Sequence, residues 1–402
     1  MTVSSRKTLM IPGPSEPDVE ILNALSRPVY PHYGPDWSEI YRDTCEEAKK
    51  LFQTGGDVII LNCSGSAGVE MGIVNLAEPG EKVLNIRNGF FSEISEDVIT
   101  KCGMTAINLD VEWGDAANPN VVADTLKKSK DIKMMYCVHN DTMTGAVNPV
   151  RELGKVATEF NIPFAVDFVS SYGGMELDVD NSHVDISVGY SSKALGAING
   201  AVPIAIQPRV WEMIKKRRKP FPGRFLNLAT WRSAIDDWGS WGHPFPSGQP
   251  TSVIVAMREA IKIALREGLQ NRYRRHRICR EATHAAVKAM GLEVFTREEV
   301  ASDTVSVIKV REGTDKRILS TMSSKHGVII GGGVSKVAGK PVSKGIAKVA
   351  GKVIRIGHMG NTAQPKYVLP ALAALELTLQ EIGEDLKPGS GVAAATEVFR
   401  KL

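Results

Sequence analysis

Short apolar runs alternate with helix-like stretches between residues 57 and 216. The apolar runs are DVIILNC (57–63), KVLNIRN (82–88), MTAINLDV (104–111), KMMYCVHN (133–140) and PFAVDFVS (163–170), and the helix-like stretches include 67–77, 121–130 and 151–160. This alternation predicts an α/β fold with a mainly parallel sheet and helices on both faces. Ligands of such sheets bind beyond the carboxyl ends of the strands, so the residues after each apolar run are the candidates for a functional site.

The two ends of the chain have different patterns. Residues 9–25 predict an extended arm that turns at Pro12-Gly13-Pro14 and enters a helix capped by Ser15. A helical run at 252–268 precedes a second, smaller α/β pattern with apolar runs at 305–310 and 353–358. We therefore expect an N-terminal arm (1–17), a large domain (18–260) and a small C-terminal domain (261–402).

Composition excludes several classes of protein. The 402 residues are 43% hydrophobic and 23% charged, and charges interrupt every apolar stretch before it reaches membrane-spanning length. The net charge of +4 is too small to indicate a nucleic-acid or membrane-surface protein, so we expect neither partner. The five scattered cysteines favour neither a disulfide framework nor a zinc site and suit a reducing compartment.

The chain termini bear on location. Residues 1–10 contain no long apolar segment of the kind that directs secretion, so we expect a cytoplasmic protein. The chain ends Arg400-Lys401-Leu402, which resembles the peroxisomal Ser-Lys-Leu signal in its last two residues, so the peroxisome is the weaker alternative.

Two basic segments stand out. Residues 334–352 carry lysines at 336, 340, 344, 348 and 352, without which the net charge of +4 would fall to −1. We expect a solvated insertion there, with a lid that attracts anionic substrates as the alternative. The segment NRYRRHRICR (271–280) spreads its arginines around a helix, which favours a solvated surface helix over an RNA-binding one.

The pair Asp167 and Lys193 is the most informative chemistry. Each follows an apolar strand, and together they are what pyridoxal phosphate requires: a lysine amine that condenses with its aldehyde and a carboxylate that keeps its pyridine nitrogen protonated. A turn-capping aspartate and a surface lysine are the alternative for a lone pair of this kind.

Neighbouring strand ends carry further cofactor contacts. Ser64-Gly65-Ser66 opens a helix whose free N–H groups suit a phosphate, unless the serine merely caps the helix. Phe91 could stack on a flat ring, or fill the core. The polar residues 141–145 could bind a phenolic oxygen, or simply form a turn. Arg355, inside an apolar run, suits a substrate carboxylate, with an internal salt bridge as the alternative.

The motifs PGP, SGSAG, NGFF, HNDTMTG, VDFVSS, SSKALG and RIGHMG occur in the order typical of class V pyridoxal-phosphate aminotransferases. The chain resembles the serine–glyoxylate and alanine–glyoxylate branch of that family over essentially its whole length. The resemblance implies the PLP-transferase fold, with a mainly parallel seven-stranded sheet in the large domain, and a homodimer, or a dimer of dimers, with active sites at the subunit interface. It implies Lys193 as the Schiff-base lysine, Asp167 on the pyridine nitrogen and Arg355 on the substrate carboxylate. Around the cofactor it places Ser64, Gly65, Ser66, Phe91, Thr142, Val169 and Ser192.

Several positions depart from the family pattern. Ser192 replaces the usual Gln, Ile198-Asn199-Gly200 replaces Pro-Pro-Gly, and Phe245 and Gly248 stand where many members present Tyr and Thr to the neighbour's phosphate. Ser247 or Gln249 could substitute for those hydroxyl donors. HNDT, VSSYGGM and HMGNTAQP resemble pyridoxamine–pyruvate aminotransferase, which uses an unphosphorylated vitamin, but SGSAG is retained and Val334 replaces that relative's second carboxylate-binding arginine.

We therefore expect ping-pong transfer of an amino group from a small amino acid, such as serine or alanine, to glyoxylate or pyruvate. The alternative is a pyridoxamine–pyruvate aminotransferase. Cysteine desulfuration is disfavoured because no cysteine lies between residues 280 and 402, where its reactive loop would be expected. The amino donor cannot be chosen, since an arginine recognises the carboxylate common to all α-amino acids.

Overall fold

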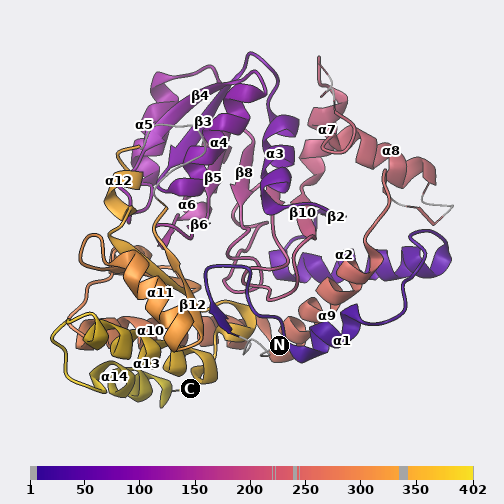
Figure 1. Ribbon diagram of the computed structural model, residues 1–402. Coiled ribbons are helices and arrows are strands. Elements are labelled where there is room, and N and C mark those ends of the chain that lie inside the picture. Colours follow the sequence, from indigo (N-terminus) through magenta and orange to yellow (C-terminus); the bar gives the residue numbers. More distant parts are fainter. Residues whose placement is uncertain are drawn as a thin grey trace.

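The computed structural model describes residues 7–219, 221, 223–238, 242–243, 245–334 and 343–401. Two sheets organise the chain (Figure 1). The larger has seven strands in the order β2 (Asp57–Leu61), β10 (Val202–Ile206), β9 (Ile186–Val188), β8 (Phe164–Asp167), β5 (Ile132–Val138), β3 (Lys82–Arg87) and β4 (Thr105–Asp110). Only β10 runs antiparallel to its neighbours. The predicted α/β fold with a mainly parallel seven-stranded sheet is confirmed.

Helices cover both faces of this sheet. The helices of the large sheet's crossover connections are α3 (Gly65–Leu76), α4 (Phe90–Lys101), α5 (Pro119–Lys128) and α6 (Val150–Glu159), and α2 (Pro35–Phe52), α7 (Pro208–Lys215) and α8 (Leu228–Trp238) pack around its β2 side. Crossovers are right-handed, so α3 and α4, which lead toward β4, lie on one face, while α5 and α6, which lead back, lie on the other. The strands other than the edge strand β4 are buried on both faces, as their nearly continuous apolar sequences predict.

A second sheet contains four strands in the order β1 (Thr8–Met10), β12 (Val328–Gly332), β13 (Val353–Gly357) and β11 (Val305–Lys309). Its helices are α10 (Leu269–Ala289), α11 (Asp315–Lys325), α13 (Pro365–Glu381) and α14 (Ser390–Phe399). The first strand comes from the start of the chain and pairs in parallel with β12. The N-terminal segment therefore crosses between the two sheets, after which α1 (Val19–Leu25) packs on α9 (Thr251–Glu267).

Three hydrophobic clusters hold the molecule together. One surrounds the large sheet and includes Ile254, Met257 and Ile261 of α9, whereas a second joins the small sheet to α10, α11 and α13. The third includes Trp113 and Met143 from one side and Val307 and Met359 from the other, so it joins the two sheets. The proposed boundaries at residues 17 and 260 stay predictions.

The lysine-rich segment is partly packed. Residues 335–342, with Lys336 and Lys340, lie outside the described residues. Beyond them, α12 (Ile346–Val349) buries Ile346 and Val349 in the third cluster, and Lys348 forms an ion pair with Glu112. The expectation of a fully solvated insertion is wrong for this described part because its apolar residues contact Trp113.

The arginine-rich segment also differs from expectation. It forms the first turns of α10, but the side chain of Arg272 is only 3% exposed and that of Arg275 17%, whereas Arg277 is 59% exposed. The prediction of a solvated surface helix is therefore wrong for one side of α10, whose Arg272 and Arg275 bind backbone carbonyls of neighbouring loops. No helix in the described part of the chain is long and apolar enough to cross a membrane.

Candidate active site

One cavity of about 230 Å³ lies at the carboxyl edge of the large sheet. Seven of the predicted site residues line it: Ser64, Gly65, Ser66, Phe91, Asp167, Val169 and Lys193. They come together because each follows or ends a strand whose carboxyl end points to the same edge: β2, β3, β8 and β9. The cavity thus unites residues that are up to 129 positions apart in the chain.

The Lys193 amine is held against the N-terminal arm. Its Nζ donates a hydrogen bond to the carbonyl oxygen of Pro12. The next residue, Gly13, has φ +94°, and a Cβ there would lie 2.3 Å from Lys193 Cδ, so only glycine fits. Burial, helped by the positive charge of Arg355 and opposed by the Asp167 and Asp141 carboxylates, lowers the pKa of Lys193 to about 8. About a fifth of this amine is therefore neutral, and nucleophilic, near physiological pH, far more than for a lysine of ordinary pKa.

Asp167 is the last residue of β8 and its side chain lines the same cavity. One carboxylate oxygen accepts a hydrogen bond from the Val169 N–H at 2.7 Å. In the described part of the chain no donor reaches the other oxygen. Burial raises the pKa of Asp167 to about 7, against the effect of that hydrogen bond. A cationic N–H donor beside this carboxylate would stabilise its ionised form.

The N-terminus of α3 forms another wall. Ser64 occupies the N-cap position with an extended backbone, but its side chain makes no capping hydrogen bond. The alternative of a merely capping serine is therefore not what the structure has. A Cβ on Gly65 would lie 3.1 Å from the Val169 side chain, so glycine keeps this corner open. Free N–H groups, the helix dipole and two serine hydroxyls make the corner suitable for a phosphate.

Arg355 lies in the middle of β13 and reaches toward the large sheet. Its Nε donates to the Gly332 carbonyl and its Nη1 to the Thr142 carbonyl, both at 2.9 Å. Burial lowers its pKa to about 10, while the Asp141 charge has the opposite effect. Among the described residues it forms no ion pair with a carboxylate, so the internal salt bridge that was the alternative is absent there. Arg355 and Thr142, both predicted site residues, are thereby in direct contact.

Asp141 organises the cavity rim, a role that the sequence analysis did not assign. Its carboxylate accepts hydrogen bonds from the N–H groups of Phe91 (2.9 Å), Met143 (2.8 Å) and Thr144 (3.3 Å). It therefore fixes the start of α4, which carries Phe91, to the turn that carries Thr142. An aspartate followed by small residues and a glycine is the signature of such a turn, so the turn alternative explains Asp141.

Ser15 serves the lysine loop instead of capping a helix. Its hydroxyl donates to the Lys193 carbonyl at 2.8 Å, and its N–H donates to the Ser192 carbonyl at 2.8 Å. Asp18 is the actual N-cap of α1, since it accepts from the Glu20 N–H. The predicted Ser15 cap is wrong because the arm runs three residues further before the helix begins.

Ser192 does not line the cavity. Its side chain is almost fully buried, and its hydroxyl lies 2.5 Å from the Asn199 side-chain oxygen. Two of the positions at which the lysine loop departs from the family pattern are thus hydrogen-bonded to each other.

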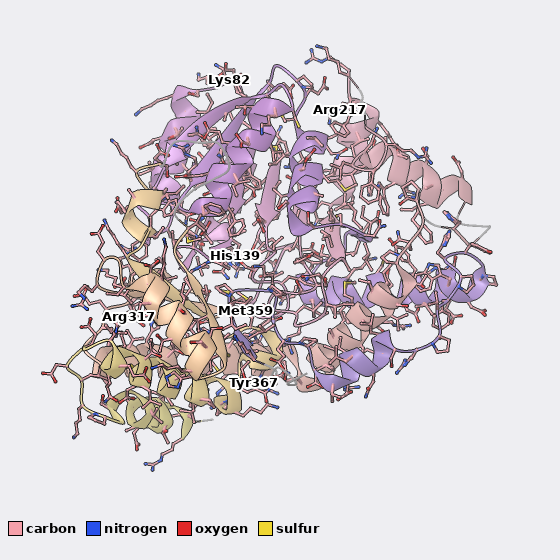
Figure 2. All side chains as sticks on the ribbon, in the orientation of Figure 1. Lys82, His139, Arg217, Arg317, Met359 and Tyr367 are labelled. Atoms are coloured by element: carbon pink, nitrogen blue, oxygen red, sulfur yellow. The ribbon has the colours of Figure 1, made fainter. Side chains whose placement is uncertain are left out.

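Further cavity residues come from α4 and from strand interiors. Tyr136, Tyr190, Ile94, Ser95 and Val98 line the cavity but were not singled out in the sequence, since aromatic and aliphatic residues there match an ordinary core pattern. The Tyr136 hydroxyl is buried without a hydrogen-bond partner. Beneath the site, the His139 N–H donates to the Asp167 carbonyl, and Figure 2 shows His139 and Met359 in the middle of the molecule.

The segment 245–249 offers few free donors. Phe245 is fully buried in the core, with its ring centroid 5.2 Å from that of Tyr41, so it stabilises its own chain. The Gly248 carbonyl accepts from the Asn62 side chain at 3.3 Å. Among the residues that the structure describes, the buried Ser247 hydroxyl and Gln249 amide have no hydrogen-bond partner. The two possible substitutes for the missing hydroxyl donors thus have unused hydrogen-bonding capacity.

Comparison with known proteins gives a consistent result. The family model described as aminotransferase class-V matches residues 22–366. The chain is 38% identical over 397 residues to an uncharacterized aminotransferase of Methanocaldococcus jannaschii, covering 98% of both chains. It is 30% identical over 389 residues to the pyridoxamine–pyruvate transaminase of Mesorhizobium japonicum, covering 96% of this chain and 95% of the relative.

Among solved structures, that of the ureidoglycine–glyoxylate aminotransferase of Bacillus subtilis superimposes with a TM-score of 0.89 at 28% identity. The superposition covers 99% of both chains. The likeness therefore extends over both sheets and over the cavity at the edge of the larger one.

Proposed function

Because the chain belongs to the class V aminotransferase family, we propose that it transfers the amino group of a small amino acid, such as serine or alanine, to glyoxylate or pyruvate. Aminotransferases of this class and fold depend on pyridoxal phosphate. The observation that carries the proposal is the single cavity lined by Lys193, Asp167 and the N-terminus of α3, with the unpaired guanidinium of Arg355 near the lysine.

The residues present fit this cofactor part by part. Lys193 is the attachment point for the aldehyde, Asp167 has a carboxylate oxygen available to the ring nitrogen, and Ser64 to Ser66 have hydroxyls and N–H groups available to the phosphate. Phe91 and Val169 supply apolar walls for the ring. When bound, pyridoxal phosphate supplies an electron sink for the carbon atom that carries the transferred amino group.

Lys193 acts as both attachment point and proton carrier in this proposal. With the amino acid in its place, the free Nζ would accept the proton that leaves the α-carbon of the amino acid and would deliver it to the aldehyde-derived carbon, so that the amino group stays behind when the keto acid leaves. A pKa lowered to about 8 suits this role, because the amine can then both accept and release a proton near neutral pH. The Pro12 carbonyl orients the amine through its hydrogen bond.

Arg355 binds the substrate carboxylate in this proposal. Two backbone carbonyls hold its Nε and Nη1, which leaves Nη2 and one hydrogen on Nη1 for a ligand. A carboxylate would supply the negative charge that no described residue supplies within ion-pair distance.

A specific observation supports a second candidate, pyridoxamine–pyruvate transamination. Phe245 is buried where many family members present a donor to the cofactor phosphate, and the relative with that activity aligns over 96% of the chain. The open corner at Ser64 favours the phosphorylated cofactor instead.

A half-reaction screen separates the two candidates. Protein loaded with pyridoxal phosphate is mixed with serine, alanine, aspartate or pyridoxamine, and the visible absorbance of the bound cofactor is followed. We expect serine or alanine to bleach the absorbance and glyoxylate or pyruvate to restore it. The second candidate is correct if no amino acid bleaches the absorbance, and if protein without pyridoxal phosphate converts unphosphorylated pyridoxamine and pyruvate.

We also propose that the chain works as a homodimer. Val29 (78% exposed) and Tyr33 (59% exposed) form an apolar surface on one segment. The Tyr30 carbonyl of this segment accepts a hydrogen bond from Thr251, which is two residues from the buried Gln249 amide. Light scattering of the wild type and of Val29→Asp tests this. A wild type of monomer mass contradicts the proposal.

A further inference from the structure

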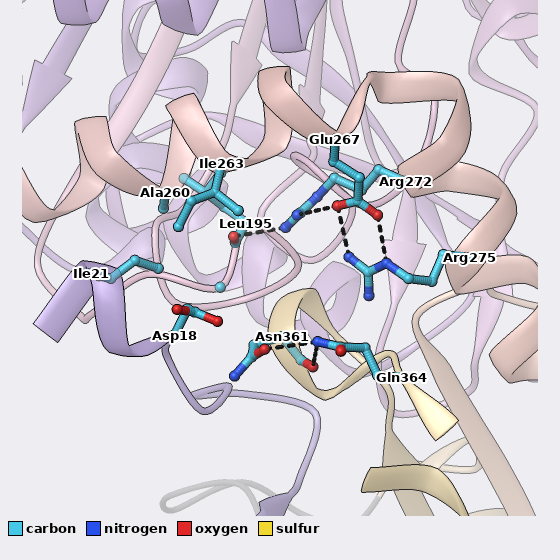
Figure 3. Close-up of a pocket in the computed structure, with 11 residues that line it drawn as sticks. Asp18, Ile21, Leu195, Ala260, Ile263, Glu267, Arg272, Arg275, Asn361 and Gln364 are labelled. Atoms are coloured by element: carbon cyan, nitrogen blue, oxygen red, sulfur yellow. Dashed lines mark hydrogen bonds and ion pairs between the residues drawn. The ribbon is translucent and has the colours of Figure 1, made fainter. Parts of the chain in front are cut away.

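Two buried arginines and a glutamate occupy the junction between the two sheets. Glu267 is the last residue of α9, and Arg272 and Arg275 lie one turn apart at the start of α10. Figure 3 shows the Glu267 carboxylate between the two guanidinium groups, in a pocket that Leu195 lines on one side and Asn361 and Gln364 on the other. This pocket is separate from the cavity that contains the Lys193 amine.

Arg272 binds the backbone next to the reactive lysine. Its Nη2 donates to the carbonyls of Ala194 (3.1 Å) and Leu195 (2.9 Å), the two residues that follow Lys193. Its Nε donates to the Gly173 carbonyl at 2.5 Å, and its Nη1 to Glu267 at 3.1 Å. Four of its five N–H groups are therefore used, three of them on large-domain backbone.

Arg275 binds the loop that follows the substrate-binding strand. Its Nη1 donates to the carbonyls of Gly360 (3.0 Å) and Ala363 (2.5 Å), five and eight residues beyond Arg355. Its Nε and Nη2 form a two-point contact with Glu267 at 2.6 and 3.0 Å. The neutral ring of His276 adds one contact, because its Nε2 accepts from the Gly360 N–H at 3.0 Å.

The two loops meet without space between them. A Cβ on Gly360 would lie 2.6 Å from the Gly196 Cα, so the backbones of the lysine loop and the 360–363 loop are in direct contact. A shift of either loop would therefore displace the other. One ion-paired group binds the carbonyls of residues 194 and 195 and those of residues 360 and 363. It therefore constrains the distance between the Lys193 amine and the Arg355 guanidinium.

Glu267 is the counter-ion that both arginines share. Burial alone would raise the pKa of Glu267, but the hydrogen bond and charge of Arg275, together with the charge of Arg272, hold it below its ordinary value. The glutamate stays ionised and is one counter-ion for two arginines, so the group keeps a net charge of +1. The other printed hydrogen bonds of the two arginines go to backbone carbonyls.

We propose that Arg272, Glu267 and Arg275, here called the α10 clamp, are positioning residues that set the place of Lys193 relative to Arg355. This inference rests on the proposed function, because the distance between Lys193 and Arg355 matters when both groups act on one substrate. The clamp acts through the backbone of residues 194–195 and 360–363 and touches neither reacting atom.

The test measures the Lys193 amine directly in protein without cofactor. Competitive labelling with acetic anhydride over a range of pH, read by peptide mass spectrometry, gives the pH midpoint of Lys193 reactivity. We expect a wild-type midpoint near the pKa of about 8 that burial imposes. Arg272→Lys keeps the positive charge but loses the planar guanidinium that binds several carbonyls at once. We expect the lysine loop to loosen and water to reach the Lys193 amine, so that the midpoint rises by about one pH unit.

Two variants make the result decisive. Arg274→Met, on the same helix turn but bonded only to the exposed Lys401 carbonyl, should leave the midpoint unchanged. Should Arg272→Lys fold poorly, Glu267→Gln removes the central charge with less disturbance and should raise the midpoint in the same direction. The proposal would be overturned if folded Arg272→Lys and folded Glu267→Gln both had midpoints within about 0.3 pH units of wild type. That margin is roughly the reproducibility of such a titration, in which one pH unit corresponds to about 1.4 kcal/mol.

A second readout separates this proposal from the proposed function. In cofactor-loaded enzyme, Arg272→Lys should lower kcat about 10- to 100-fold and change KM much less, because misplacement of the amine affects the chemical step more than binding. If the wild type shows no transamination, the proposed function fails, while the labelling midpoint still decides whether the clamp positions Lys193.

Discussion

The molecule buries arginines in two regions, and the regions treat them in opposite ways. In the α10 clamp, Arg272 and Arg275 share the Glu267 carboxylate and direct their remaining hydrogens to carbonyls. Arg355, whose charge acts on Lys193, does not itself line the cavity. Among the described residues two backbone carbonyls hold it, and no carboxylate pairs with it. Both regions desolvate positive charge, and the pKa values of Arg272 and Arg355 are each lowered to about 10 by burial.

The difference indicates what each charge is for. A buried ion pair that the chain completes itself costs desolvation and contributes mainly geometry. A buried guanidinium without a carboxylate has a similar desolvation cost, and in the free protein no ion pair offsets that cost. The binding of an anion would offset this cost, which supports the proposal that Arg355 binds the substrate carboxylate while Arg272 and Arg275 hold the surrounding backbone.

The largest expected effect tests whether the cavity beside Arg355 is the reaction site at all. Lys193→Ala removes the only lysine that lines the cavity and should reduce transamination below detection. The variant should fold normally, because it deletes a buried amine whose pKa is lowered by desolvation. Steady-state assays with alanine and glyoxylate measure the loss, and substantial turnover by this variant would disprove the assignment.

The next effect separates Arg355 from an exposed arginine by activity. Arg355→Leu should lower kcat/KM for amino acids about 10³-fold, since two charge-assisted hydrogen bonds to the carboxylate are lost. Its stability should change little, as the variant also removes a desolvated charge. Arg274→Met is the matched control and should keep wild-type kinetics. Equal losses in both variants would mean that Arg355 has no special relation to the substrate.

Measurements of stability should single out the α10 clamp instead of Arg355. Glu267→Ala leaves two buried guanidinium groups without their counter-ion and should lower the free energy of unfolding by about 2–3 kcal/mol, a value reduced from that of a fully buried pair because Glu267 is partly exposed. Glu259→Ala, on the same helix, removes a single long contact with the exposed Arg266 and should cost less than about 1 kcal/mol. Urea unfolding of both variants measures the difference.

Comparable losses in these two glutamate variants would show that Glu267 is not the centre of the clamp.

The smallest effect concerns pH. The Lys193 amine must be neutral to react with the cofactor aldehyde, and its lowered pKa of about 8 predicts that the rate of cofactor loading rises about tenfold per pH unit below 8 and levels off above it. Stopped-flow absorbance measures the rate. A rise that continues to pH 10 would indicate a lysine with an ordinary pKa, and the claim that burial activates this amine would then be wrong.

The sequence predicted the large sheet and most of the cavity because both depend on local patterns. Strands such as 57–61 and 164–167 are apolar runs that end in polar residues, and parallel strands bring those ends to one edge. The roles of Ser15 and Arg272 could not be found this way. Each binds the backbone of the lysine loop, from 177 and 77 or more positions away, and backbone carbonyls leave no trace in a residue pattern.

The arginine-rich stretch illustrates the same limit. Its charges spread around the helix, which is typical of a solvated surface. In the structure, however, α10 packs on α14, α13 and β11, and the side that carries Arg272 and Arg275 faces the loops that follow β9 and β13. Only the tertiary arrangement distinguishes that side from the one that carries Arg277.

The most direct test of the central claim locates the covalent attachment itself. Protein incubated with pyridoxal phosphate is reduced with borohydride, digested and analysed by mass spectrometry. We predict that the cofactor mass is found on the peptide that contains Lys193 and on no other lysine peptide. Finding the modification on another lysine, or finding none while the protein still transaminates, would contradict the account.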